Sequence, residues 1–172
     1  MRLRPAKAGE PNQKSCSQCT KCCITHPCAL APSDLGEIAD HFNLREEELF
    51  RRYLVLDYVE TGGKRQYYVC PARKNDRPGT IVELGWTFSD SSCIFLNGQA
   101  CSIQEVKPKG GKTLYCSLMM NSNRNLVGYG KRSSVRDWNR TDILKVLLNV
   151  ANKHKEEREI YSKPSLRRIP GH

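Results

Sequence analysis

The spacing of apolar and polar positions predicts two short helices within the first third of the chain. Apolar side chains recur at helical spacing in two places: Leu35, Ile38, Ala39 and Phe42 after Asp34, and Leu49, Phe50, Tyr53 and Leu54 after Asn43. Asp34 followed by Glu37, and Asn43 followed by Glu46, are typical of capping boxes that open a helix. Residues 15–31 are too short and irregular for a helix, and we expect a loop there.

Two segments predict β-hairpins. Residues 54–60 and 65–70 are rich in β-branched and aromatic residues and flank Gly62-Gly63. Residues 93–96 and 100–103 flank Asn97-Gly98, which is a strong turn signal. Residues 80–88 predict a further strand, and 107–112 a Pro/Gly/Lys loop.

The strongest helical pattern lies near the C-terminus. Thr141 is placed to cap it, and its apolar side would carry Ile143, Leu144, Val146, Leu147, Val150 and Ala151. The pattern as a whole predicts a small single α+β domain: a cysteine-rich metal-binding loop, short helices and β-hairpins, and a long C-terminal helix.

Composition restricts the class of protein. The chain has 172 residues, 38% of them hydrophobic and 27% charged, which is enough for one modest core. No run approaches the ~20 apolar residues of a membrane span. The basic N-terminus lacks the hydrophobic region of a secretory signal. We therefore expect a soluble cytoplasmic protein with no transmembrane segment.

Positive charge is concentrated at the two ends of the chain. Of the formal net charge of +10, residues 1–14 contribute +3, residues 15–123 zero and residues 124–172 +7. We expect a basic arm (1–14), a cysteine-cluster metal-binding domain (15–123), and a basic helix and tail (124–172) packed on that domain. Basic ends fit docking on a larger protein complex or redox enzyme, and more weakly on nucleic acid; a solvated helix face explains them too.

The most informative motif is a dense run of cysteines. The chain has nine in total, and five of them follow the pattern C-x2-C-x2-C-C-x4-C: Cys16, Cys19, Cys22, Cys23 and Cys28. Two-residue gaps allow successive thiolates to turn toward one ion. The C-x2-C-x2-C spacing is closer to iron–sulfur proteins than to zinc fingers.

The remaining four cysteines form a second group, Cys70, Cys93, Cys101 and Cys116. Cys93 and Cys101 flank the Asn97-Gly98 turn and could approach each other. Disulfides need an oxidising compartment. The odd number of cysteines and the absence of a recognisable signal peptide both weigh against disulfides. Buried inert thiols explain scattered cysteines but not five within thirteen residues. Metal or cluster ligation by the nine cysteines is the favoured interpretation.

These residues resemble the YkgJ-type CxxCxxCC cysteine-cluster family, whose members are described as zinc- or iron-chelating domains. The signature reads CSQCTKCC here, and the similarity continues in the segment from Pro32, in Phe50-Arg-Arg-Tyr, and in the block from Cys93 to Ile103. The family's later R-P-x-x-C-R step is similar to Lys107–Lys112, which lacks the cysteine, so Cys116 is the candidate replacement. The resemblance implies a metal site and no particular reaction.

Other residues have simpler explanations. His26 lies within the cysteine run and is a weaker ligand candidate, whereas His41 and His154 are expected at the surface. Trp86 and Trp138 are expected in the core. Lys109–Lys112 could bind an anion, although a plain flexible loop is the favoured interpretation.

Three functions follow. The first is an iron–sulfur protein, with one or two clusters of the [4Fe-4S] type, acting as a redox or accessory subunit. The second is a zinc-stapled, non-enzymatic binding module whose basic C-terminal segment contacts an acidic protein or nucleic acid. A metal enzyme ranks last, because no acid–base pair or nucleophile constellation is present; whether the protein is an enzyme stays open.

Overall fold

In the computed structural model, residues 23–24, 28–82, 91–113 and 131–162 are described, the stretches 112–113 and 156–162 by their backbone alone. The elements are, in chain order, α2 (Pro32–Phe42), α3 (Glu46–Tyr53), β1 (Leu54–Thr61), β2 (Lys64–Pro71), β3 (Leu96–Asn97), β4 (Ala100–Cys101), α4 (Lys109–Thr113), α6 (Lys131–Trp138) and α7 (Asp142–Ser162). Helices and small antiparallel sheets confirm the predicted α+β class. The proposed boundaries near residues 14 and 123 lie outside the described residues and stay predictions.

The β1–β2 hairpin is the longest sheet of the described chain. Its antiparallel register runs from Leu54 opposite Pro71 to Thr61 opposite Lys64. Gly62 and Gly63 form the turn with φ of +58° and +71°, a backbone conformation that glycine adopts without steric cost. The predicted hairpin is confirmed, as is the shorter one, in which Leu96 lies opposite Cys101.

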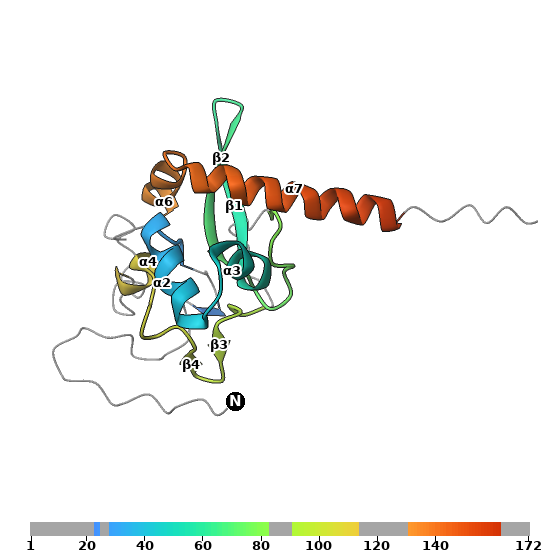
Figure 1. Ribbon diagram of the computed structural model, residues 1–172. Coiled ribbons are helices and arrows are strands. Elements are labelled where there is room, and N and C mark those ends of the chain that lie inside the picture. The colour runs from blue at the N-terminus through green and yellow to red at the C-terminus, as the bar shows by residue number, and fades with distance from the viewer. Residues whose placement is uncertain (1–22, 25–27, 83–90, 114–130, 163–172) are drawn as a thin grey trace, which may run out of the picture.

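Helices pack around this hairpin (Figure 1). α6 packs against β2, α3 leads directly into β1, and α7 packs against α3. The tip of the β1–β2 hairpin and the β3–β4 hairpin lie at opposite ends of the molecule, and the C-terminal half of α7 extends beyond the other elements. None of the helices in the described chain combines the length and hydrophobicity required to cross a membrane.

The core lies between α2, α3, the hairpin and the two C-terminal helices. Its fully buried side chains include Leu35, Ile38, Phe50, Leu56, Val69, Trp138 and Leu147. Trp138 confirms its predicted core position, and its indole Nε1 donates a hydrogen bond to the carbonyl of Leu30 at 2.8 Å. A stack of Phe42, Tyr53 and Phe95, with centroids 4.9–5.9 Å apart, joins the β3–β4 region to α2 and α3.

The predicted helix starts were wrong by a few residues. α2 begins at Pro32, and Asp34 sits in its first turn, where its carboxylate accepts the Ala31 N–H at 2.7 Å. Asn43 ends α2 with φ of 53° rather than opening α3, whose first-turn Glu48 accepts the Arg45 N–H at 3.2 Å. The acidic residues therefore act from the third helical position, because a carboxylate there reaches back to the N–H before the helix.

Several smaller predictions also need correction. Lys109–Thr113 forms the short helix α4 where a loop was expected, and Cys23 and Ile24 have helical backbone within the expected loop 15–31. Of the strand predicted over 80–88, the described part forms only a bridge between Leu56 and Ile81.

On the C-terminal helix, α7 begins at Asp142, directly after Thr141, but the Thr141 hydroxyl donates back to the Trp138 carbonyl at 2.8 Å. Val146 is 42% exposed instead of packing on the apolar side. His154 is half-buried, and its Nε2 accepts a hydrogen bond from Arg51 at 2.6 Å. His41 is exposed as predicted.

Candidate metal centre

Cys70 lies at the base of the hairpin, where β2 enters the core. It is 1% exposed and faces Val55 across the hairpin. Because side chains alternate along a strand, Cys70 shares one face with Tyr68 and with Asp57 of β1. The thiol is thus held on a rigid element rather than on a loop.

The segment that carries Cys28 runs beside β2. Leu30 N–H donates to the Val69 carbonyl at 3.0 Å, which places this segment along the free edge of the strand. The Leu30 carbonyl accepts two hydrogen bonds from α6, from Ser134 Oγ at 2.7 Å and from Trp138 Nε1 at 2.8 Å. Cys28 is therefore positioned two residues before a fully buried anchor.

Cys93 lies beside the end of β2 and is bonded through the main chain to Cys23. It forms an antiparallel bridge with Arg73, just after β2, and its N–H donates to the carbonyl of Cys23 at 2.7 Å. Ile94 N–H donates to the Ala72 carbonyl at 2.8 Å. These main-chain bonds bring the signature cysteine Cys23 beside the second cysteine group.

α4 packs directly against Cys28. A Cβ added at Gly111 would lie 3.4 Å from Cys28 Sγ and 3.1 Å from Lys107 Cε, so glycine allows the helix to approach closely. α4 is held by the Lys109 N–H, which donates to the Asp34 carboxylate at 3.1–3.2 Å. Asp34 thus joins α2 to α4 as a structural residue, in keeping with its expected capping role.

The thiols interact electrostatically. Burial raises the pKa of Cys70 well above its ordinary value, and the charges of Asp57, Cys28, Asp76 and Cys93 act in the same direction. An uncompensated thiolate is unfavourable in such a place, because burial and neighbouring negative charge both oppose ionisation. A bound cation would reverse this balance.

A buried polar group adjoins Cys70. The Asp57 carboxylate accepts hydrogen bonds from the Tyr68 hydroxyl and from the Tyr58 N–H, and Lys131 Nζ lies 3.4 Å from its Oδ2. Lys131 also lies over the Tyr68 ring, 5.1 Å from its centroid. Burial, followed by the charges of Cys70 and Asp57, raises the pKa of Tyr68 far beyond its usual range.

Sequence reasoning missed the buried Asp57 group and a group of three arginines. The signals were an aspartate directly after the apolar run Leu-Val-Leu of β1 and the four-residue spacing of Arg132, Arg136 and Arg140. The three arginines line a groove of about 510 Å³ at the hairpin tip.

The predicted ligands are only partly placed. Cys23, Cys28, Cys70, Cys93 and Cys101 lie within the described residues. Cys101 lies in β4 opposite Leu96 rather than opposite Cys93. Cys16, Cys19, Cys22, Cys116 and His26 lie outside the described residues, as does Trp86. Within the described chain, no three Cys, His, Asp or Glu side chains are already grouped as a metal site.

The donor chemistry nevertheless fits a soft metal. Thiolates are the preferred ligands of zinc and of iron–sulfur clusters, and main-chain hydrogen bonds join the segment of Cys93 to Cys23 and the segment of Cys28 to the strand of Cys70. The described cysteines come from separate segments, so an ion shared among them would hold those segments together.

One comparison with known proteins gives a match. A family model described as "CxxCxxCC: Putative zinc- or iron-chelating domain" matches residues 15–127, which is more than half of the chain. No curated protein and no solved structure matches.

Proposed function

Because the chain belongs to the CxxCxxCC family of zinc- or iron-chelating domains, we propose that its cysteines bind an iron–sulfur cluster. The protein would serve as a cytoplasmic redox or accessory subunit of a larger enzyme or assembly. The ligands would be drawn from Cys16, Cys19, Cys22, Cys23, Cys28, Cys70, Cys93, Cys101 and Cys116. When bound, the cluster would accept and release single electrons.

The observation that carries the proposal is the convergence at the base of the hairpin. Cys28 and Cys70 come from segments joined by the Leu30–Val69 hydrogen bond, and Cys93 is joined to Cys23 through the main chain. Nine thiols exceed the four that one structural zinc needs, which favours a cluster or two sites. Cys70 and Cys93 are buried, so exclusion of water from their sulfurs would tune the potential of a bound cluster.

A zinc-stapled binding module is the second candidate. Cys70 and Cys93 are buried within the hydrophobic core cluster, so an ion there would act on folding directly. Three arginines, Arg132 and Arg136 on α6 and Arg140 in the turn after it, offer a surface for an acidic protein or nucleic acid, as such a module requires.

The test is metal analysis of protein purified without oxygen. About four irons and four sulfides per chain, with a broad absorbance band near 400 nm, would support the cluster. One or two zinc ions with no visible absorbance would reject the cluster in favour of the zinc module.

Matched variants identify the ligands at the convergence. Cys70→Ala should lower the metal content, whereas Val69→Ala, its buried neighbour in the same strand, should lower stability and leave the metal bound. Full metal content in Cys70→Ala would remove Cys70 from the ligand set.

A further inference from the structure

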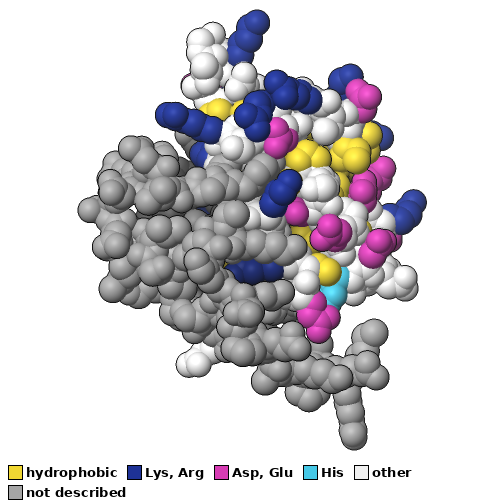
Figure 2. All heavy atoms as spheres, turned by 90° about the vertical axis from the view of Figure 1, so that its left-hand side faces the viewer, with side chains coloured by type: hydrophobic (Ala, Val, Ile, Leu, Met, Phe, Trp, Pro, Cys, Tyr) yellow, Lys and Arg dark blue, Asp and Glu magenta, His cyan; other side chains and the backbone are white. Residues whose placement is uncertain are grey.

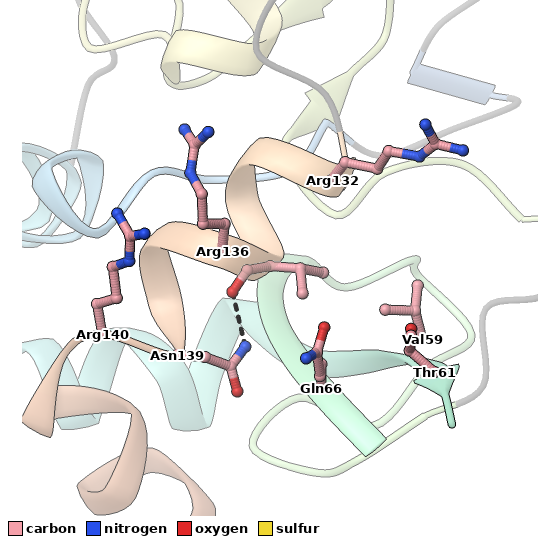
Figure 3. A pocket seen from close by; sticks show the side chains of 8 residues that line it. Val59, Thr61, Gln66, Arg132, Arg136, Asn139 and Arg140 are labelled. Carbon is pink, nitrogen blue, oxygen red and sulfur yellow. Dashed lines mark hydrogen bonds between the residues drawn. The ribbon is translucent and has the colours of Figure 1, made fainter. Parts of the chain in front are cut away.

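A groove lies between α6 and the outer half of the β1–β2 hairpin. Its strand residue Gln66 is four positions from Cys70 in β2. The groove has a volume of about 510 Å³ and is lined by Val59, Thr61, Gln66, Arg132, Val135, Arg136, Asn139 and Arg140. In Figure 3 the strand residues lie on one side, and the arginine side chains extend from α6 and the turn that follows it. We call this feature the arginine groove.

The helix side of the arginine groove is fixed to the hairpin. Asn139 Nδ2 donates to the Tyr67 carbonyl of β2 at 2.9 Å and to the Val135 carbonyl at 2.6 Å. At the other end of α6, Lys131 contacts buried Asp57. The arginine row is therefore held in place at both ends, so little ordering is needed when a ligand binds.

The arginines are available to an anion. All three are exposed, and only Arg136 has an ion pair, with Asp137 at 3.1 Å. Within the described chain, Arg132 and Arg140 contact no carboxylate. Lys and Arg side chains gather over the upper part of the face shown in Figure 2, and most of its Asp and Glu lie below them.

The length of the row suits a phosphate backbone. Arg132 and Arg136 are four helical residues apart, a rise of about 6 Å, and Arg140 follows in the turn after α6. One strand of a duplex presents a phosphate about every 3.4 Å of its axis, so the two helical arginines span roughly two phosphates and Arg140 extends the row beyond them. Guanidinium groups also form bidentate hydrogen bonds with phosphate oxygens, which the lysine ammonium group cannot do.

The lining argues against the other kinds of partner. In Figure 3 the three guanidinium groups lie apart from one another, whereas a small enclosed anion would require them to converge on one point. A protein partner usually anchors large side chains in a central apolar pocket, and only Val59 and Val135 offer apolar surface here. No aromatic residue lines the arginine groove, so stacked single-stranded bases would find no platform.

We propose that the arginine groove binds the sugar-phosphate backbone of a nucleic-acid duplex without reading its sequence. Arg132, Arg136 and Arg140 contact successive phosphates, and Gln66, Thr61 and Asn139 offer neutral hydrogen-bonding groups beside them. The inference deepens the second candidate function, whose binding surface it specifies, and it holds with either metal. Its test measures duplex binding, so its failure is separable from failure of the metal assignment.

The experiment measures fluorescence anisotropy of a labelled duplex DNA with the full-length, metal-loaded protein. Three phosphate contacts predict a slope of log affinity against log salt of about −2.7, or an affinity roughly 40-fold lower at 200 mM than at 50 mM salt. The triple variant Arg132→Gln, Arg136→Gln and Arg140→Gln should lose at least about tenfold in affinity at 50 mM and most of that slope.

A control variant removes the same charge elsewhere. Arg52→Gln, Arg77→Gln and Lys155→Gln changes three exposed residues that do not line the arginine groove. It should bind almost as well as the wild type. Equal losses in the two triple variants would overturn the proposal, because net charge alone would then explain binding. Displacement of the duplex by polyglutamate at equal charge would also overturn it and indicate an acidic protein partner.

Discussion

One face of the β1–β2 hairpin carries two sites of opposite character at its two ends. At the base, Cys70 is 1% exposed and adjoins other thiols, whereas at the tip Gln66 is exposed and faces arginines. The two positions are four residues apart, or about 13 Å along the strand. Strand alternation puts both side chains on the face that α6 covers, so one helix stabilises the base and supplies the charges at the tip.

The difference teaches how burial assigns roles along a single element. The boundary between the buried base and the exposed tip is formed by three residues, Asp57, Tyr68 and Lys131. The Asp57 carboxylate is buried, whereas its partner Lys131 reaches the surface. Changes at the base should act on stability and metal content, and changes at the tip on anion binding alone. Four predictions test that separation.

Metal removal should have the largest effect. With free metal at about a thousand times its dissociation constant, binding contributes about 4 kcal/mol to the folded state. Chelation should then lower the melting temperature by roughly 8–16 °C for a chain of this size. Scanning calorimetry before and after chelation measures this, and Cys16→Ser or Cys19→Ser should lower metal content and solubility together. An unchanged melting temperature in protein shown to be metal-free would contradict the coupling, as would wild-type metal content in both serine variants.

Trp138→Ala should be next, with a loss of about 3–5 kcal/mol in the free energy of unfolding. The substitution creates a cavity and removes one of the two hydrogen bonds to the Leu30 carbonyl. Ser134→Ala removes the other bond and should cost only about 1 kcal/mol. Urea unfolding of the metal-loaded protein gives both values. Equal costs for the two variants would mean that packing of the indole matters little.

Asp57→Asn should cost about 1–3 kcal/mol, because it weakens a buried hydrogen-bonded carboxylate facing Tyr68 and Lys131. Asp137→Asn is the matched control, since Asp137 is only half-buried and is ion-paired to the exposed Arg136. That change should cost less than about 1 kcal/mol. Chemical denaturation compares the pair, and a similar cost for both would argue that the boundary group is not a stabilising unit.

Arg132→Gln should have the smallest effect on stability, within about 0.5 kcal/mol, because the side chain is exposed. It should still reduce the salt slope of duplex binding by about 1. Arg77→Gln should change neither quantity. Titrations at several salt concentrations measure the slope, and a melting curve measures stability. A stability loss as large as that of Asp57→Asn would end the proposed separation of the two ends.

Local signals predicted most of the elements of the fold. Gly62-Gly63 and Asn97-Gly98 marked both hairpins, because these turns need residues that tolerate positive φ. Helix starts were less predictable, since Asp34 can act either before a helix or within its first turn. α4 was missed because Gly110 and Gly111 disfavour helices. Both glycines are buried, and the Lys109 N–H bonds to Asp34, so tertiary contacts override the propensity.

The site was predicted in its chemistry but not in its geometry. The cysteine spacing indicated a metal, and the matching family model agrees. What brings Cys28 and Cys93 near Cys70 is a set of long-range main-chain bonds, such as Leu30 to Val69, that leave no mark in local sequence. The arginine groove was missed for a related reason: the spacing of its arginines and the hairpin were both visible in the sequence, but the packing of α6 against β2 was not.

The bonds to the Leu30 carbonyl have a consequence for biosynthesis. Trp138 lies 108 residues after Leu30, and a ribosome adds about 5–20 residues per second. The segment after Cys28 therefore waits roughly 5 to 20 seconds before its α6 partner has been synthesised. During that interval the thiols stand in an unfinished domain, open to oxidants and to the wrong metal. Delivery of the correct metal is thus best timed to the end of translation, when α6 has been made and can pack against β2 and bond to the Leu30 carbonyl.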